Sequence, residues 1–317
     1  MIVGLLAIVV AVFAFYPSDH YIFLPDPARS VEPLVHVEGE HDRPGEGGIY
    51  MVDIIVRKAS LLERFFPGIH DGATLVPADL YNPQNLPERI QRQQGLAEMS
   101  ASQKIAAAVA LRELGYKVTQ DGVVVSAVDV GAPADGVLRP GDVIVGAQGD
   151  DVADPEDLTR VMATLEPGDH VTLRIERGGA EQTVEVGTKA SEDQPPRALM
   201  GIVIEPKLVL PVDVSINTGQ IGGPSAGLAF TLDIIDELGP KDIDQGRTVV
   251  ATGEIALDGS VHEIGGIKQK TIGARDAGAD VFLVPDENAE GARRYADGLR
   301  IVPVSDVDEA LHALATG

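Results

Sequence analysis

One serine among glycines and one pair of lysines are the residues whose types and spacing in this chain could do chemistry. Ser225 lies in the segment GGPSAG, Gly222–Gly227, and Lys268 and Lys270 lie in the segment GGIKQK, Gly265–Lys270. A serine hydroxyl becomes a nucleophile when a neighbouring base takes its proton, and a neutral lysine amine can be that base. The two segments therefore indicate nucleophilic catalysis at Ser225.

A predicted strand and a predicted helix flank Ser225. Val212–Ile216 alternates β-branched residues, as strands do. Apolar residues at i, i+4 and i+7, namely Leu228, Leu232 and Ile235, indicate a helix. Gly239-Pro240 provides its stop signal. Ser225 would then lie at the helix N-terminus, where free N–H groups and the helix dipole stabilise developing negative charge.

Small and rigid residues surround that serine: Gly222, Gly223, Pro224 and Gly227. The missing side chains of the glycines let a substrate backbone come close. A simpler interpretation makes Ser225 a helix N-cap, with Gly-Pro as ordinary punctuation before the helix. A phosphate loop is disfavoured, because the pattern GxxxxGK[ST] is absent from the sequence.

The two lysines differ in the direction that helical periodicity gives them. In a helix that begins near Ile267, Lys268 and Lys270 are separated by roughly 200° around the axis. Lys270 shares its face with Ile267, Ala274 and Ala277, whereas Lys268 lines up with Arg275. Lys270 is thus expected to point inward, either with its stem buried and its amine at the surface or with a desolvated amine that serves as a base.

Three motifs together resemble a known family. GGPSAG, ATGEI at Ala251–Ile255 and GGIKQK, in this order, are similar to the proteolytic domain of Lon proteases. The resemblance runs from about Ala198 to Ala315, and it implies a Ser-Lys dyad of Ser225 and Lys270. It also implies that Thr252 helps to hold the lysine. The chain departs from the family just before the serine, where it has Gln220-Ile221 in place of the common Lys-Asp.

A Ser-His-Asp triad is the rival arrangement, because His262 and Asp258 follow closely in sequence. Asp258-Gly259 is, however, the signature of a hairpin turn. His262 is therefore more simply explained as a strand residue after that turn.

The middle of the chain carries a second signal. Leu114–Val186 combines strand patterns with a PAxxxLxPGDVI segment that begins at Pro133, and it resembles a PDZ domain of the bacterial protease-associated type. Such domains add an extended peptide to the edge of their sheet. Gly122–Ser126 is the candidate edge strand, with Val123, Val124 and Val125 at its centre, and Leu114, Gly115 and Tyr116 form the candidate loop that holds the peptide end. A spacer without a peptide ligand is the alternative.

These resemblances predict an α/β (α+β) Lon-type proteolytic domain with an inserted, mostly β PDZ domain and an N-terminal transmembrane helix. The expected order is an anchor at 1–17, the first part of the protease domain at 18–112, the PDZ domain at 113–190 and the domain with the dyad at 198–317. An alanine-rich helix from Met99 to about Leu114 and an early strand at Gly48–Lys58 belong to the protease domain. Residues 59–98 have no assigned chemistry.

Composition excludes several kinds of site and partner. The chain has no cysteine, which rules out disulfides and thiolate metal sites. Its seven histidines show no metal-binding spacing, so neither a metal nor another cofactor is expected. A net charge of −24 argues against nucleic acid or an anionic membrane surface as a partner. Protein or peptide substrates remain, and Lon-type domains often form rings, which makes a homo-oligomer a further expectation.

The first sixteen residues, Met1–Tyr16, carry no charged side chain. As a helix they would span about 24 Å, against roughly 30 Å for a bilayer core. Their uniform apolar character favours a membrane anchor over a buried core helix, and no basic region or cleavage site suggests a signal peptide. The architecture that the chain resembles is typically a single-pass cell-membrane protein with its protease domain outside the cytoplasm.

The expected function is therefore an ATP-independent serine endopeptidase that forms an acyl-enzyme and cleaves unfolded or extended cell-envelope proteins. A membrane-anchored PDZ scaffold that binds peptides, with an inactive remnant of the protease fold, is the alternative from another class. The intact Ser225, Thr252 and Lys270 favour the peptidase.

Overall fold

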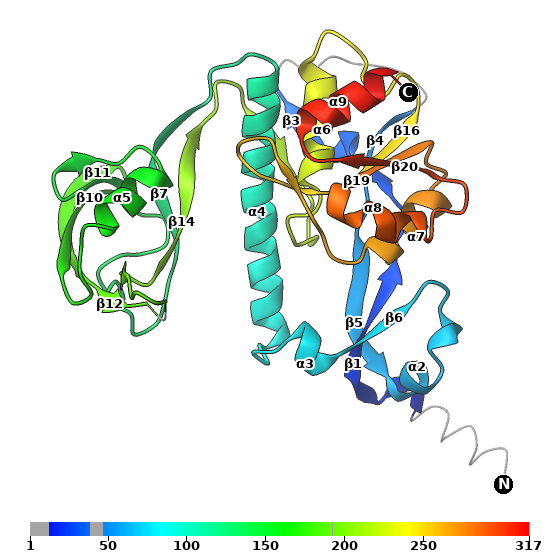
Figure 1. Cartoon of the computed structure of the whole chain (residues 1–317), viewed down its shortest axis with the longest axis horizontal. Coiled ribbons are helices and arrows are strands. Elements are labelled where there is room, and N and C mark those ends of the chain that lie inside the picture. The colour runs from blue at the N-terminus through cyan, green and yellow to red at the C-terminus, as the bar shows by residue number, and fades with distance from the viewer. Residues whose placement is uncertain (1–12, 39–46, 192, 317) are drawn as a thin grey trace. The chain divides into compact units, whose positions relative to one another are not determined.

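The chain folds as two compact units. A computed structural model describes residues 13–38, 47–191 and 193–316. The first unit combines Met1–Tyr116 with Val212–Gly317, and the second unit is Lys117–Pro211 (Figure 1). The second unit therefore interrupts the first in sequence. Its end differs from the boundary expected at residue 190, because a strand at Ile202–Val209 pairs with the strand that opens the unit.

The second unit is mostly β. Its antiparallel sheet has the order β11-β10-β8-β7-β14, and the short β9 pairs with β8. The elements are β7 Thr119–Val128, β8 Val143–Ala147, β9 Asp150–Asp151, α5 Pro155–Met162, β10 His170–Arg177, β11 Ala180–Gly187, β12 Lys189–Ala190, β13 Ala198–Leu199 and β14 Ile202–Val209. Asp142 of the PGD segment is buried and accepts bonds from Arg177 at 2.6 and 2.7 Å. This pair fixes the turn before β8.

The prediction of the peptide-binding edge in this unit is wrong. Gly122–Ser126 lies in β7, which has β8 on one side and β14 on the other, so Val123, Val124 and Val125 offer no free edge. The edge of the sheet on this side is β14. The alternating pattern of β7 identified a strand, but it could not identify the strands that pair with it.

The expected end-holding loop also has another role, because Leu114, Gly115 and Tyr116 close helix α4 of the first unit. The Gly115 N–H donates to the carbonyl of Arg112, and the Tyr116 N–H donates to that of Leu111. Gly115 has φ +82°, the left-handed conformation that ends many helices in this pattern. These residues are a helix C-cap, and the second unit starts after them.

The first unit is α/β and is built on a five-stranded sheet of order β2-β4-β16-β19-β20. The last four strands are parallel, and β2 is antiparallel to β4. Its strands are β2 Arg29–Ser30, β4 Gly48–Met51, β16 Thr248–Ala251, β19 Val281–Pro285 and β20 Arg300–Val304. Its helices are α6 Gly227–Leu238, α7 Ile267–Asp276, α8 Asp286–Arg293 and α9 Val307–Thr316. The β19 strand is buried along its whole length, as expected for a parallel strand covered by helices.

Further elements of the first unit complete the frame of the site. A second sheet has the order β5-β1-β6, and two further strand pairs are β15-β3 and β17-β18. The bounds are β1 Pro17–Pro25, η1 Glu32–Leu34, β3 Val35–Val37, β5 Ile54–Ser60, α2 Leu61–Phe65, η2 Pro67–Ile69, β6 Thr74–Pro77, α3 Ala78–Tyr81, α4 Glu88–Glu113, β15 Val214–Ile216, β17 Glu254–Ile255 and β18 Val261–His262. Helix α4 thus starts eleven residues before the expected Met99.

The segment Gly48–Lys58 is not one strand, as predicted, but two. Residues 48–51 form β4 of the parallel sheet, and the chain then crosses at Val52 and Asp53 to become β5 of the second sheet. Apolar residues flank Asp53 on both sides, and the sequence reading carried the strand across this single charged residue. Residues 59–98 contain α2, β6, α3 and the start of α4.

The expected anchor at 1–17 falls mostly on residues 1–12, which lie outside the described residues. Within the ranges given above, no helix has both the length and the apolar character needed to cross a membrane.

Candidate active site

Ser225 lies in the loop between β15 and α6. Helix α6 begins at Gly227 after an N-cap at Ala226, which makes no side-chain cap. The Ser225 hydroxyl instead lies 2.6 Å from the Nζ atom of Lys270. The N-cap interpretation of Ser225 is therefore wrong. A Cβ atom at Gly227 would lie 2.7 Å from Ile255 Cγ2, so only glycine lets the helix start this close to β17.

Helix α4 holds the loop from one side. The Gly223 N–H donates to the Gly95 carbonyl at 2.8 Å, and the Ser102 hydroxyl donates to the Pro224 carbonyl at 3.0 Å. Gly223 has φ +92°, which favours glycine at this turn. Sequence reasoning missed Gly95 and Ser102. A glycine inside an otherwise helical pattern was the available signal for a close backbone approach.

Lys270 points inward from α7, as helical periodicity predicted. The helix follows Gly266, which has φ +73°, and the Lys270 side chain is 2% exposed. Lys268 is half-buried and donates to the carbonyl of Ala73 at 2.9 Å, on the other side of the helix from the serine. Only one of the two lysines therefore reaches Ser225.

Thr252 joins the serine loop to the lysine. Its hydroxyl donates to the Ser225 carbonyl at 3.0 Å and accepts a bond from Lys270 Nζ at 3.0 Å. The Gly253 N–H donates to the same carbonyl at 2.9 Å. Thr252 is fully buried directly after β16, so the parallel sheet fixes the position of both groups. The role that the family resemblance implied for Thr252 agrees with this geometry.

Burial lowers the pKa of Lys270 to about 7, and the negative charge of Asp53 opposes this effect. Burial also raises the pKa of Asp53 itself, while the Arg29 guanidinium at 3.2 Å acts in the other direction. Asp53 lies at the crossing between β4 and β5, and sequence reasoning did not connect it with the site. Near neutral pH, a substantial fraction of the Lys270 amines is uncharged and able to accept a proton.

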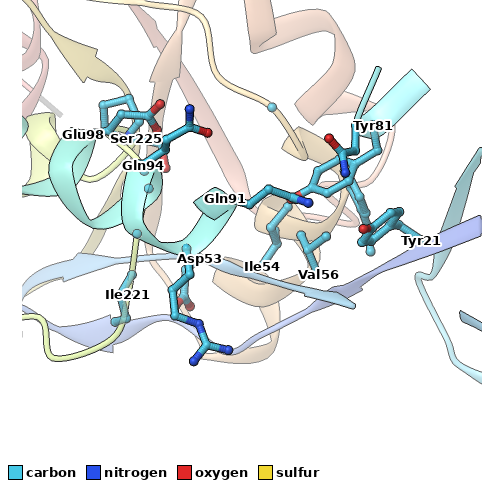
Figure 2. A pocket seen from close by; sticks show the side chains of 18 of the residues that line it. Tyr21, Asp53, Ile54, Val56, Tyr81, Gln91, Gln94, Glu98, Ile221 and Ser225 are labelled. Carbon is cyan, nitrogen blue, oxygen red and sulfur yellow. The ribbon is translucent and has the colours of Figure 1, made fainter. Parts of the chain in front are cut away.

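The dyad opens into a pocket of about 1010 Å³ within the first unit. Its walls come from β1, β5, the region of α3 and α4, and the loops around Ser225 and Gly265 (Figure 2). Gln94 and Glu98 reach it from α4, and Tyr81 from α3. Burial raises the pKa of Glu98, with a further contribution from the nearby charge of Glu254. The pocket is long and partly polar, which suits an extended chain better than a compact apolar ligand.

The rival triad does not form. The Nε2 atom of His262 lies 3.1 Å from Ser260 Oγ, and that hydroxyl donates to Asp258. These residues belong to the hairpin that joins β17 and β18, with Asp258 and His262 exposed and Ser260 half-buried, and Gly259 has φ +90° in its turn. The prediction of a hairpin at Asp258-Gly259 is correct, and no bond links it to Ser225 among the described residues.

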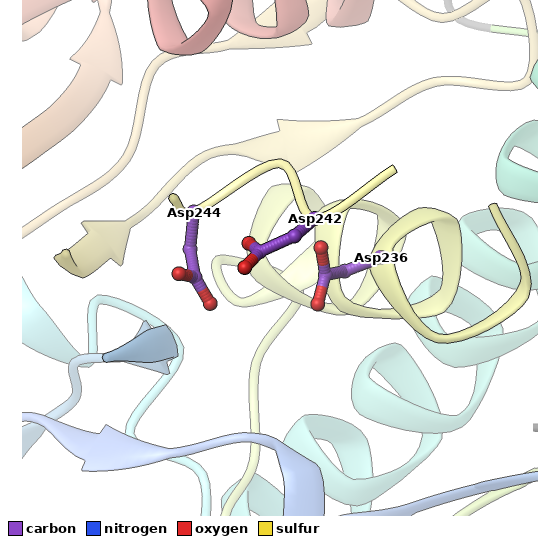
Figure 3. A group of neighbouring side chains, drawn as sticks. All are labelled: Asp236, Asp242 and Asp244. Atoms are coloured by element: carbon purple, nitrogen blue, oxygen red, sulfur yellow. The ribbon is translucent and has the colours of Figure 1, made fainter. Parts of the chain in front are cut away.

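Three acidic side chains gather at the C-terminal end of α6, away from Ser225. Asp236, Asp242 and Asp244 bring ligand oxygens within 4.8 Å of one another (Figure 3). Backbone N–H groups already donate to two of them, from Ile243 to Asp236 and from Gly246 to Asp244. Burial raises the pKa of Asp244 to about 6. When these carboxylates are ionised, their negative charges repel one another, and this repulsion from Asp242 and Asp236 also raises the pKa of Asp244.

Comparisons with known proteins agree with both units. Residues 210–316 match the family of the Lon protease (S16) C-terminal proteolytic domain, and residues 109–188 match the PDZ domain family. The Lon protease of Azorhizobium caulinodans is 38% identical over 117 residues, which are 34% of this chain and 13% of that protein. Lon protease 2 of Bacillus subtilis is 38% identical over 102 residues, which are 31% of this chain and 18% of that protein.

A solved PDZ domain, that of the SdrC-like protein from Listeria monocytogenes, is 27% identical with a TM-score of 0.26, and the match covers 28% of this chain and 92% of that one. The chain spans less than a fifth of the length of the Lon relatives named above. The matched regions define a protein with a PDZ domain and a Lon-type proteolytic domain. Residues 109–188 thus resemble PDZ domains, and residues 210–316 resemble the proteolytic domain of Lon proteases.

Proposed function

We propose that this chain is an ATP-independent serine endopeptidase that cleaves extended segments of cell-envelope proteins through an acyl-enzyme. The observation that carries the proposal is the distance of 2.6 Å between Ser225 Oγ and the Nζ atom of the buried Lys270. A hydroxyl and an amine at this distance can exchange a proton directly.

The first step needs the uncharged amine. When Lys270 is neutral, its Nζ atom accepts the Ser225 proton while Oγ attacks the carbonyl carbon of the peptide bond. Thr252 keeps Nζ in place, because its hydroxyl is held by the Ser225 carbonyl and faces the amine at 3.0 Å. The low pKa of Lys270, about 7, supplies the neutral form without a second base.

The attack places a negative charge on the carbonyl oxygen, which needs hydrogen-bond donors. The backbone N–H groups of Ser225 and Ala226 make no backbone bond in the part of the chain that the structure describes, and they lie just before α6. They are the donors for the oxyanion, assisted by the helix dipole. The protonated Lys270 then gives its proton to the leaving amine. Water, deprotonated by the same lysine, hydrolyses the ester and restores Ser225.

A covalent serine-reactive fluorophosphonate tests this mechanism on the purified chain. The expected result is one added mass, mapped to Ser225, that disappears in Ser225→Ala. Lys270→Ala should label very slowly, whereas Lys268→Ala should label at nearly the normal rate. Labelling at another serine would refute the assignment. An unreactive Ser225 in a folded chain would favour the inactive PDZ scaffold instead.

We expect the enzyme to select substrates that are already unfolded. This sequence contains no P-loop pattern, which an ATP-driven unfolding domain would carry. The enzyme then depends on segments that a substrate exposes by its own local opening. A flexible, casein-like protein should be degraded much faster than a compact domain of similar size, and ATP should change neither rate. Stimulation of the purified chain by ATP would contradict this part of the proposal.

For the PDZ domain, we assign peptide recognition to β14 in place of β7. β14 is the edge strand, α5 packs against it, and Val203 on it is 53% exposed. A peptide could add as a further strand along this edge. Val203→Asp should slow the cleavage of protein substrates and spare a short peptide, whereas Val130→Asp, at a 98% exposed loop position of the same unit, should change neither. Equal behaviour of the two variants would refute the assignment.

The location that we propose is the cell membrane, with Met1–Tyr16 as a single anchor and both units outside the cytoplasm. The support is the uninterrupted apolar sequence of that segment. Because the chain has no cysteine, Val130→Cys provides a single label site. A maleimide that cannot cross membranes should modify this variant on intact spheroplasts. Protection until the cells are lysed would reverse the orientation. A homo-oligomer remains a prediction that sedimentation of the detergent-solubilised chain can check.

A further inference from the structure

An apolar patch on α2 and its neighbours has no part in the catalytic proposal. We define the α2 patch by five exposed side chains, with exposed fractions of 87% for Phe15, 63% for Tyr16, 60% for Phe65, 59% for Phe66 and 51% for Ile69. Most surface apolar residues occur singly, whereas large groups of them mark contact sites. This group includes three phenylalanines in a chain that has seven, so nearly half of that residue type is found here.

The α2 patch is presented on a braced turn. Ser60 and Glu63 form a capping box at the start of α2, with bonds of 3.2 and 2.8 Å. Arg57 binds the Glu63 carboxylate at 2.5 and 3.0 Å, and His70 Nε2 lies 2.8 Å from the same group. These bonds tie both ends of the turn to one buried carboxylate. Phe65 and Phe66 are therefore exposed on a turn that hydrogen bonds fix in place, and not on a loose loop.

The α2 patch continues directly into the apolar N-terminal segment. The Leu61 N–H donates to the Tyr16 carbonyl at 3.0 Å, and the rings of Phe13 and Phe65 are 6.1 Å apart. The last residues of the uncharged stretch Met1–Tyr16 thus touch α2. Wherever that stretch enters an apolar medium, the α2 patch must lie at its boundary.

The charges around the α2 patch are balanced, whereas the chain as a whole is strongly negative, and a balanced region is better suited to a lipid surface. Of the carboxylates next to the α2 patch, Glu63 is paired with Arg57 and Asp19 with Arg64 at 2.5 Å, and Asp71 is exposed. Lys58 adds an exposed positive charge on the adjacent end of β5. In a chain of net charge −24, this region has no excess of negative charge that anionic headgroups would repel.

We propose that the α2 patch is inserted in the membrane interface and fixes the protease unit upright on the bilayer. The inference rests on the proposed anchor. Phe65 and Phe66 enter the boundary between headgroups and acyl chains, and Tyr16 lies at headgroup level, where aromatic side chains are favoured. The occupant is lipid and not a second copy of the chain, because the apolar segment that would enter the bilayer leaves from the same place.

This placement sets the height of the active site. β5 runs from Ser60, beside α2, to Ile54, which lines the pocket of Ser225. Six residue steps of a strand span no more than about 20 Å. The pocket therefore opens within about 20 Å of the membrane surface. Chains that are tethered to or emerging from the same membrane can enter it after only a few extended residues.

Tryptophan fluorescence tests the inference in the full chain, which contains no tryptophan of its own. Phe66→Trp and Ile69→Trp place one indole in the α2 patch. His312→Trp places a control indole at an exposed position of α9, at the opposite end of the first unit (Figure 1). Each variant is inserted into vesicles of phosphatidylcholine and phosphatidylglycerol with brominated acyl chains. Serine-probe labelling at Ser225 checks that each variant is folded and active.

The two patch variants should show blue-shifted emission and lose most of their fluorescence to the bromines, whereas His312→Trp should keep nearly all of it. If the chain floats with the vesicles but all three indoles stay unquenched, the inference is overturned and the anchor stands. A blue shift that depends on protein concentration without bromine quenching would assign the patch to a second copy. Failure to float removes the anchor and the inference together, while probe labelling still reports on the peptidase.

Discussion

Replacing Lys270 by methionine should abolish peptide cleavage and at the same time stabilise the fold. Below pH 7 the wild-type chain must carry a buried, protonated amine whose pKa is about 7, against 10.5 for an ordinary lysine. The difference corresponds to roughly 5 kcal/mol of folding free energy that the charge costs. The hydrogen bonds from Lys270 to Ser225 and Thr252 offset part of it, at about 1 kcal/mol each. A gain of a few kcal/mol remains for Lys270→Met at pH 6.

The sign of the pH dependence follows from proton uptake. Between pH 7 and 10.5 the unfolded chain binds a proton at Lys270 that the folded chain does not, so wild-type stability rises with pH in this window. The advantage of Lys270→Met should therefore shrink steadily from pH 7 and vanish near pH 10. Urea unfolding of both proteins across this range measures it, with Lys268→Met as the control that lacks this pH dependence.

The same pKa should govern catalysis. Acylation needs the neutral amine, so the wild-type rate should rise about tenfold from pH 6 to pH 8 and then level off. A lysine of ordinary pKa would give a hundredfold rise over that span without a plateau. A flat rate profile, or a Lys270→Met variant that is less stable than wild type at pH 6, would refute the account of a desolvated base.

Three further changes test other parts of the first unit. Gly222→Ala should slow serine-probe labelling roughly tenfold to a hundredfold, because the new Cβ would lie 2.9 Å from the Gly95 carbonyl carbon. Gly95→Ala is the control and should keep the normal rate, because its Cβ would have no contact shorter than 3.6 Å. Equal labelling rates of the two variants would contradict the packing argument. Asp53→Asn removes the charge that raises the pKa of Lys270, so the acid limb of the rate profile should move to lower pH, and an upward shift would contradict this electrostatic role. Asp244→Asn should raise the melting temperature at pH 8 but hardly at pH 4. With a pKa of about 6 in the folded chain, the ionised Asp244 carboxylate lowers the free energy of unfolding by roughly 3 kcal/mol above pH 6. A gain in melting temperature of the same size at both pH values would exclude the charge as its cause.

Local patterns, together with the resemblance to Lon proteolytic domains, were enough to predict the dyad but not the frame around it. Helical periodicity alone gave Lys270 its inward direction, and the GGPSAG segment placed Ser225 just before a helix. A glycine in a helical pattern could mark Gly95, but the partners of Gly95 and Ser102 could not be found in this way, because Gly223 and Pro224 lie more than a hundred residues further along the chain. Such contacts depend on how helices pack, and no short window of sequence contains that information.

The PDZ edge shows the same limit for strands. Alternation identified β7 correctly as a strand, but the identity of an edge depends on the order of strands in the sheet. β14 lies beyond the expected end of the domain and carries Pro206, a residue that strands tolerate at edges. The break at Val52 and Asp53 was missed for a similar reason, since apolar residues lie on both sides of it and only the pairing of strands shows that β4 and β5 enter different sheets.

The way in which Thr252 and Lys270 surround Ser225 has a consequence for the synthesis of this enzyme. The serine leaves the ribosome before its base, and the strands β19 and β20, which complete the sheet behind Thr252, come later still. A nascent chain that ends before about residue 300 therefore has a serine without a desolvated lysine beside it, and such a chain has no working nucleophile. The order of the sequence thus delays assembly of the site until β19 and β20 have been synthesised.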